Sequence, residues 1–264
     1  MKITPLVDVP LDGDMALIYS PNEIGKTVST LLSAPSSIFV LDVESRPLGR
    51  TIDVVKEVRP DVEIDFGEWE SFDDTMSFLN DYQKNLIDKK YRTLFVDSYT
   101  ALMAMELIPE LQRQAYEARK KENKASTLQT KDIISQFKVT EELYGGVGTG
   151  TIRITGLLKK IAATGIVVIC SALEDRDPKT RILTGCELNP LFEGKQFMKA
   201  MPGNFNLIGR LRSRKDKDGK IVYPPMIDFR DDAGGKFLAK YTGLEGKTTG
   251  PLDWSKILRK KEGE

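Results

Sequence analysis

The chain has 264 residues, with 39 basic and 39 acidic side chains, no histidine and two cysteines. This length suits one large domain, or a domain with appendages, and is enough to bury a hydrophobic core. The zero net charge excludes a uniformly basic nucleic-acid-binding protein, although it is compatible with a local basic groove. Because histidine is absent, a Ser-His-Asp triad, a Cys-His dyad and a histidine-ligated metal site are all excluded.

The remaining composition bears on the cellular compartment. Cys170 and Cys186 are too few for a disulfide scaffold or a cysteine metal site. Acidic residues interrupt the first 20 positions, and the longest apolar stretch, at residues 161–173, is too short to span a bilayer. We therefore expect a reduced, cytoplasmic protein without a membrane partner.

Short apolar runs predict the strands. They are rich in β-branched residues and do not alternate with polar ones, which is typical of buried parallel strands. In chain order they are residues 15–19, 37–41, 93–96 and 166–170. Apolar residues at helical spacing predict helices over residues 71–88, with Ser71 and Asp74 at the start, and over 152–163. This alternation predicts an α/β domain with a mostly parallel central sheet flanked by helices.

Other segments interrupt or follow this pattern. Residues 108–150 are dense in charge and predict an exposed helix or a mobile insertion, which ends in a flexible loop at the glycine-rich residues 145–150. Asp218-Gly219 lies between two short apolar runs and predicts a β-hairpin near the C-terminus. We expect one domain over residues 1–250, then a charged tail at 251–264 that frays from Trp254 onward.

The segment that follows the first predicted strand has the pattern of a phosphate-binding loop. Residues 20–27 read SPNEIGKT, which matches G-x-x-x-x-G-K-[ST] except that Ser20 replaces the first glycine. In such a loop the backbone N–H groups point at phosphate oxygens, the lysine approaches the β- and γ-phosphates, and the hydroxyl binds Mg²⁺. The predicted phosphate-binding residues are Ser20, Pro21, Asn22, Glu23, Ile24, Gly25, Lys26, Thr27 and Val28.

Acidic residues follow two other predicted strands. Asp97 ends the run TLFVD, and Asp42 and Glu44 lie in LDVES. In a parallel sheet these carboxyl ends share the edge that carries the ligand crevice. We expect Asp97 to hold Mg²⁺ together with Thr27, and Glu44, with Asp42 in reserve, to polarise the attacking water.

In this order the motifs SPNEIGKT, VLDVES and LFVDSYTAL resemble the RecA-like branch of the P-loop ATPases. Over about residues 12–245 the chain is also similar to phage- and archaea-associated AAA-type ATPases grouped with RecA-like single-strand annealing or recombination proteins. The resemblance implies a RecA-like fold, hydrolysis of ATP with Mg²⁺ through Lys26 and Glu44, and a homo-oligomeric ring or filament on single-stranded DNA. A single-strand DNA-binding protein is a further expected partner, and a viral chain would work in the host cytoplasm.

The chain departs from this family at two positions. Leu173 stands where relatives have a polar sensor of the γ-phosphate, although nearby Ser171 can substitute weakly. The string AKYTG has Lys240 but Thr242 in place of an arginine that would reach a neighbouring subunit's nucleotide. Lys195 is a second candidate for that role in trans. These departures predict slow hydrolysis, or hydrolysis regulated by assembly.

Basic segments supply candidate DNA contacts. The loop after Leu173 carries Arg176, Lys179 and Arg181, and further candidates are residues 113–131 and 210–220. The alternatives are a solvated charged surface at each of these segments, a P-loop NTPase with no DNA partner, and a nucleotide-binding module that does not hydrolyse.

Overall fold

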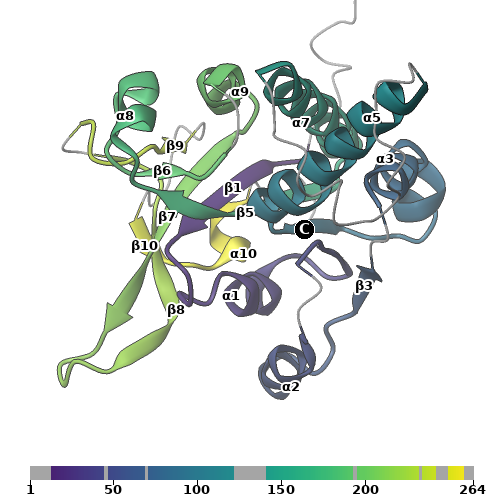
Figure 1. The fold of residues 1–264 in the computed structure, drawn as a ribbon. Helices are drawn as coiled ribbons and strands as arrows, with labels where there is room; N and C mark the ends of the chain where they lie inside the picture. The colour runs from purple at the N-terminus through teal and green to yellow at the C-terminus, as the bar shows by residue number, and fades with distance from the viewer. Residues whose placement is uncertain are drawn as a thin grey trace, which may run out of the picture.

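The computed structural model describes residues 13–44, 47–68, 71–121, 141–192, 195–231, 234–241 and 249–258. A central sheet organises them (Figure 1). Its strand order is β10 (Thr249–Pro251), β8 (Ile221–Asp228), β7 (Leu207–Lys215), β1 (Met15–Ser20), β5 (Val167–Asp175), β4 (Thr93–Asp97), β2 (Ile38–Asp42) and β3 (Ile64–Glu68). Two short strands, β6 (Asn189–Pro190) and β9 (Lys240–Tyr241), pair with β5 and β7.

The strands from β7 to β3 run parallel, whereas β8 and β10 are antiparallel to their neighbours. The structure therefore has the mostly parallel sheet that the alternation of strands and helices predicts, together with the hairpin predicted from Asp218-Gly219. The predicted fold class is confirmed. Because the parallel strands share one direction, their carboxyl ends meet at one edge, where ligand sites of such sheets lie.

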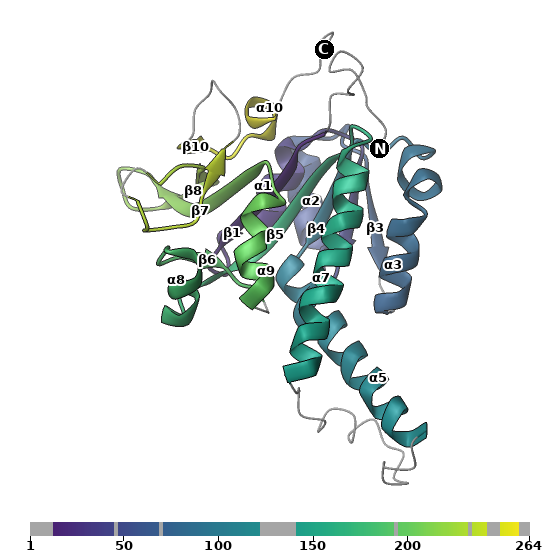
Figure 2. The same ribbon diagram turned by 90° about the horizontal axis from the view of Figure 1, so that it is seen from above.

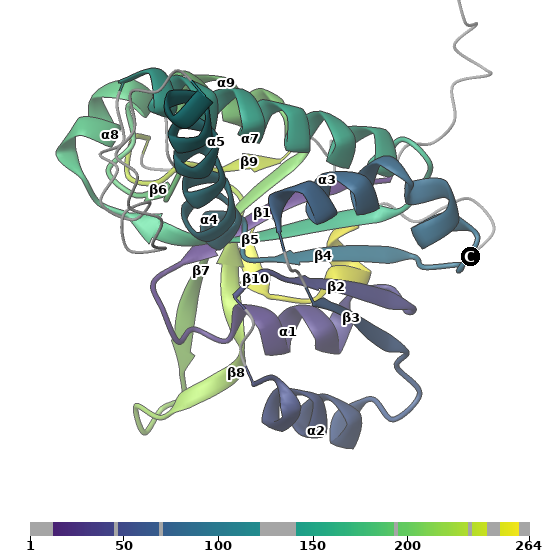
Figure 3. The same cartoon turned by 45° about the vertical axis from the view of Figure 1, so that its right-hand side comes forward.

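Helices cover both faces of the sheet (Figure 3). One face carries α3 (Phe72–Asn80) and α7 (Glu141–Ala162), and the other carries α1 (Lys26–Ser33), α2 (Gly49–Val58) and α10 (Trp254–Ile257). The pleat of β1 divides the core accordingly, because successive side chains point to opposite faces. Met15, Leu17 and Tyr19 join the cluster beneath α7, whereas Ala16 and Ile18 join the cluster beneath α1.

The predicted strands agree with the structure to within a few residues, except that β5 extends further, to Asp175. The predicted helix start at Ser71 is also confirmed, since its side chain accepts a hydrogen bond from the backbone N–H of Asp74 at 3.2 Å. The helix is shorter than predicted. It ends at Asn80, and a separate π-helical turn, η2 (Gln83–Ile87), follows it.

The prediction of a flexible loop at residues 145–150 is wrong, because these residues belong to α7. The helix continues through the glycines because its apolar stripe is buried, with Val147, Ile154 and Leu158 at most 1% exposed. Along its length α7 packs on α5 as well as on the strands β1 and β5. Tertiary packing of this kind overrides the low helix propensity of glycine.

The charged region before α7 is helical where it is described. After α4 (Tyr99–Ala101) and the π-helical turn η3 (Leu102–Leu107) comes α5 (Ile108–Lys121). Figure 2 shows α5 and α7 extending side by side beyond the sheet. Residues 122–140 of the predicted insertion lie outside the described residues.

The C-terminal region confirms one prediction and corrects another. Strands β7 and β8 form the predicted hairpin, and Gly219 has the positive φ of 79° that its turn requires. The fraying of the tail from Trp254 is wrong for its first residues, because Trp254 is fully buried and begins α10. Residues 259–264 lie outside the described residues. Within the described part of the chain, no helix has the length and apolar character needed to cross a bilayer.

Candidate functional site

The predicted phosphate loop joins β1 to α1 at the carboxyl edge of the sheet. Gly25 precedes the helix with φ 84° and ψ 33°, a left-handed conformation that glycine adopts without steric cost. Glu23 also has a positive φ, of 64°. The turn therefore brings the chain to the N-terminus of α1, where free backbone N–H groups favour an anion.

Lys26, the first residue of α1, folds back across this loop. Its Nζ donates hydrogen bonds to Ser20 Oγ at 3.0 Å, to Pro21 O at 3.3 Å and to Ser20 O at 3.4 Å. Ser20 is fully buried, and its hydroxyl in turn donates to Pro21 O at 2.7 Å. The residue that replaces the first glycine of the motif thus holds the lysine ammonium group inside the loop.

Thr27 connects the loop to the acidic strand. Its hydroxyl donates to Asp97 Oδ2 at 2.6 Å, and Ser171 donates to Asp97 Oδ1 at 2.5 Å. Asp97 is 1% exposed, so both oxygens of this carboxylate are fixed by hydroxyl groups from neighbouring segments. Ser171 lies on β5, the strand between β1 and β4. The predicted metal-binding pair is therefore in direct contact, and Ser171 joins it.

These residues fit a magnesium ion. A hydroxyl and a carboxylate beside a phosphate loop supply the hard oxygen ligands that Mg²⁺ binds together with substrate phosphates and water. Among the described residues no group of three or more carboxylate, thiol or imidazole side chains could hold a metal ion by itself.

Glu44 lies two residues beyond the end of β2, at the same edge of the sheet. Its Oε1 accepts a hydrogen bond from Ser98 Oγ at 2.7 Å, and Ser98 directly follows Asp97. Asp42, the reserve candidate, pairs in register with Asp97 and is 8% exposed. Glu44 is less buried than Asp42, and it accepts its hydrogen bond from the residue next to Asp97, the predicted metal ligand. This position suits a base that acts on water.

Tyr223 is a residue of this site that the sequence did not indicate. A Cβ on Gly25 would lie 2.6 Å from Tyr223 Cε1, so the ring packs directly on the phosphate loop. The ring is nonetheless 53% exposed. Tyr223 reaches the loop from β8, almost 200 positions later in the chain, and no local pattern points to such a contact.

The predicted DNA contacts do not form one open basic loop. The segment after β5 contains a short helix, α8 (Pro178–Thr184), which includes Lys179. Asp177 caps this helix, because its Oδ1 accepts a hydrogen bond from the backbone N–H of Lys179. Arg176 pairs with Glu174 at 2.8 Å and Arg181 with Glu187 at 3.4 Å. These arginines are still 68% and 60% exposed, so their charges remain accessible from solvent.

The two candidates for action in trans lie away from the phosphate loop. Lys195 begins α9 (Lys195–Ala200), although its side chain lies outside what the structure describes. Lys240 lies on β9, and its Nζ donates to Pro202 O at 2.8 Å. Thr242 is not among the described residues.

A comparison with known protein families shows to which family the chain belongs. A family model described as an AAA domain matches residues 12–232. The chain belongs to this AAA-domain family. The matched range includes both the phosphate loop and the acidic strand ends of this AAA domain.

Two further comparisons add little to this. No curated protein matches the chain. The crystal structure of a KaiC-like protein from the hyperthermophilic archaeon Pyrococcus horikoshii has a TM-score of 0.36 and 11% identity, over 82% of this chain and 78% of that one. A likeness this distant carries no argument about activity. Family membership therefore makes this a nucleotide-binding ATPase domain of the AAA type.

Proposed function

We propose that this AAA domain binds ATP together with Mg²⁺ on residues 20–28 and hydrolyses it slowly. The hydrogen-bonded pair of Thr27 and Asp97 beside the start of α1 is the observation that carries the proposal. Lys26 would exchange its contacts with Ser20 and Pro21 for phosphate oxygens, since an ammonium group binds an anionic acceptor more strongly than a neutral one. Bound Mg²⁺ would neutralise charge on the β- and γ-phosphates.

The chain's own residues account for slow turnover. Glu44 would accept a proton from the attacking water, with Ser98 fixing one carboxylate oxygen. Leu173 offers no polar group to the γ-phosphate, while Ser171 is already engaged with Asp97. Thr242 stands in place of the arginine that would act in trans, and Lys195 and Lys240 are the residues proposed for that role. Transition-state charge would therefore be stabilised incompletely in an isolated subunit.

We further propose that the chain acts on single-stranded DNA as a homo-oligomeric ring or filament, in recombination or strand annealing. The accessible charges of Arg176 and Arg181 support this, as does the resemblance of the motifs. A single-strand DNA-binding protein is the second partner that the resemblance implies, and the cytoplasm is the proposed location.

The test combines calorimetry with turnover. The chain should take up ATP in the presence of Mg²⁺, and Lys26→Ala should abolish or severely weaken that uptake. Glu44→Gln should keep nucleotide binding and lose phosphate release. If no adenine nucleotide binds to the unaltered chain at saturating Mg²⁺, the proposal is wrong.

Hydrolysis and DNA binding are separated by a second measurement. Phosphate release and sedimentation would be followed together, with and without a poly-dT oligonucleotide. Binding of labelled oligonucleotide that weakens with salt supports the DNA partner. Nucleotide binding without phosphate release above the Lys26→Ala level would instead favour a binding module, and hydrolysis without oligonucleotide binding would favour an NTPase with no DNA partner.

A further inference from the structure

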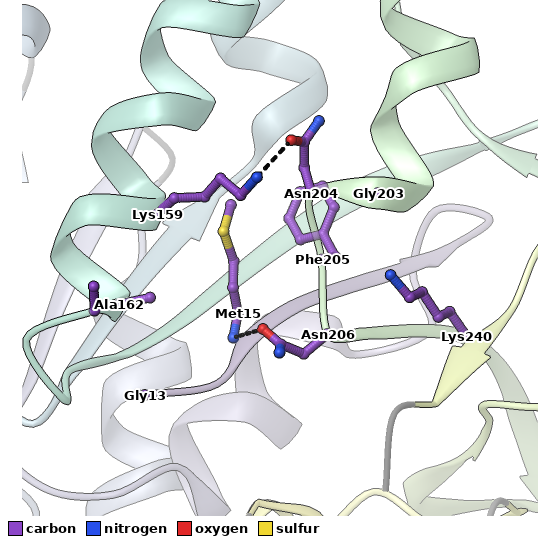
Figure 4. Close-up of a pocket in the computed structure, with 10 residues that line it drawn as sticks. Gly13, Met15, Lys159, Ala162, Gly203, Asn204, Phe205, Asn206 and Lys240 are labelled. Atoms are coloured by element: carbon purple, nitrogen blue, oxygen red, sulfur yellow. Dashed lines mark hydrogen bonds between the residues drawn. The ribbon is translucent and has the colours of Figure 1, made fainter. Parts of the chain in front are cut away.

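A cavity lies at the opposite edge of the sheet from the phosphate loop, and Figure 4 shows the residues that line it. Its volume is about 300 Å³, and its walls come from α7, from β9 and from the segment at residues 203–206. Met15, the first residue of β1, lines it, whereas Ser20, the last residue of β1, opens the phosphate loop. Five strand steps separate the two residues, so the two sites are roughly 17 Å apart.

Two ammonium groups face this cavity. Figure 4 shows Lys159 from α7 and Lys240 from β9 reaching toward residues 203–206 from opposite sides. Lys159 Nζ donates to Asn204 Oδ1 at 3.0 Å, and Lys240 Nζ donates to Pro202 O at 2.8 Å. Both acceptors are neutral, and neither lysine forms an ion pair with a described residue.

Lys159 and Lys240 both line this cavity, and each ammonium group carries a positive charge. An anion in the cavity that contacts both groups would be attracted by two charges at once.

The rest of the wall defines the kind of anion. Asn206 accepts a hydrogen bond from the backbone N–H of Met15 at 3.2 Å through Oδ1, which orients its amide NH₂ as a donor away from that contact. Phe205, Met15 and Ala162 also line the cavity, but each is at most 4% exposed, so a ligand would contact them little. The accessible groups of the cavity are therefore mainly cationic and polar donors, which suit an oxyanion.

We propose that this cavity binds a small oxyanion between Lys159 and Lys240, as part of a phosphate ester or a carboxylate. The two ammonium groups would bind the oxyanion. The inference does not rest on nucleotide binding at the phosphate loop of the same subunit, since no residue of that loop lines the cavity.

The test uses Lys26→Ala protein, so that the phosphate loop does not contribute. Inorganic phosphate and, separately, citrate would be titrated at constant ionic strength, with the side-chain amide signals of Asn204 and Asn206 followed by NMR. We expect a saturable shift of both signals. Tighter binding of phosphate would identify a phosphate ester as the ligand class, and tighter binding of citrate a carboxylate.

Variants test whether the NMR shift arises from binding in this cavity. Lys159→Met and Lys240→Met should each weaken the apparent affinity about tenfold or more, because each removes one charge-assisted contact. Lys160→Met is the matched control, since Lys160 neighbours Lys159 on α7 but does not line the cavity, and it should leave the affinity unchanged. The absence of a saturable shift, or a shift that persists unchanged in both cavity variants, would overturn the proposal.

Discussion

Ser20 is the single residue at which this phosphate loop differs from the usual pattern. It is fully buried, and its Oγ and the carbonyl oxygen of Pro21 both accept hydrogen bonds from Lys26 Nζ. The serine therefore gives the lysine ammonium group an acceptor within the loop. This acceptor would compete with the phosphates of a bound nucleotide for the lysine.

Ser20→Gly should consequently bind ATP about threefold to tenfold more tightly, since one hydrogen bond contributes about 0.5–1.5 kcal/mol net. Isothermal titration calorimetry with Mg²⁺ measures the change. Ser20→Ala is the control, because it removes the hydroxyl while keeping the Cβ, and its affinity should change in the same direction. Weaker binding by both variants would show that the serine does not compete with the phosphates.

Tyr223 presents a different residue-scale case, because its ring packs on Gly25 and is 53% exposed. Tyr223→Ala should leave the fold stable and weaken ATP binding about threefold to tenfold, because the loop loses the surface against which it packs. Tyr223→Phe keeps the ring and should bind like the unaltered chain. Equal losses in both variants would assign the effect to the hydroxyl instead.

Among the elements, α7 has the least expected sequence. Its glycines lower the helix propensity of the segment. At Gly148 and Gly156 there is room for a larger side chain, because no neighbouring atom lies within 4 Å of a Cβ built there. The apolar face of the helix, rather than its local preference, therefore sustains it.

Gly148→Ala and Gly156→Ala should each raise the free energy of unfolding by about 0.5–1 kcal/mol, since alanine loses less backbone entropy on folding. Urea unfolding measures this. Gly146→Ala is the contrasting variant, because its Cβ would lie 3.1 Å from Leu111 Cδ2 and crowd α5. A gain at Gly146 as large as at the open positions would mean that this crowding has no cost.

A side-chain hydrogen bond joins β3 to the segment before β4. The Tyr91 hydroxyl donates to Asp65 Oδ2. Burial, followed by the hydrogen bond to Asp65 and its negative charge, raises the pKa of Tyr91 from 10.0 to about 12. The neutral phenol is therefore favoured in the folded chain, and ionisation favours the unfolded one.

The stabilisation from Tyr91 should be complete below pH 10 and should be lost as the pH rises to about 12. Urea unfolding of the unaltered chain and of Tyr91→Phe across this range tests the prediction. The stability difference between them should be constant below pH 10 and should fall above it. A difference independent of pH up to 12 would contradict the raised pKa.

For the molecule as a whole, the C-terminal segment completes the layer that supports the phosphate loop. Trp254 is fully buried in the cluster that also contains Leu31 of α1, and its backbone N–H donates to Ser33 Oγ at 3.1 Å. The helix whose N-terminus faces the nucleotide site is thus held from behind by residues more than 200 positions away.

Trp254→Ala should lower the free energy of unfolding by about 3–5 kcal/mol, as expected for the removal of a large buried ring. Differential scanning calorimetry measures the loss. Lys256→Ala is the control from the same helix, because its side chain is 81% exposed. Comparable losses in both variants would show that the segment docks through something other than the ring.

Local signals allowed much of this molecule to be predicted. The β-branched runs gave the strands β1, β2, β4 and β5, and the spacing of Gly25, Lys26 and Thr27 indicated the phosphate loop. The contact between Thr27 and Asp97 could also be expected, because the carboxyl ends of parallel strands share an edge. These features follow from patterns a few residues long.

Tertiary structure alone decided the rest. Local propensity favoured a loop at residues 145–150 and a fraying tail at Trp254, but burial of apolar side chains against neighbouring elements reversed both. The positions of Tyr223 on Gly25 and of Lys159 with Lys240 around one cavity depend on the order of strands in the sheet. That order brings together residues far apart in the chain, and no local pattern encodes such contacts.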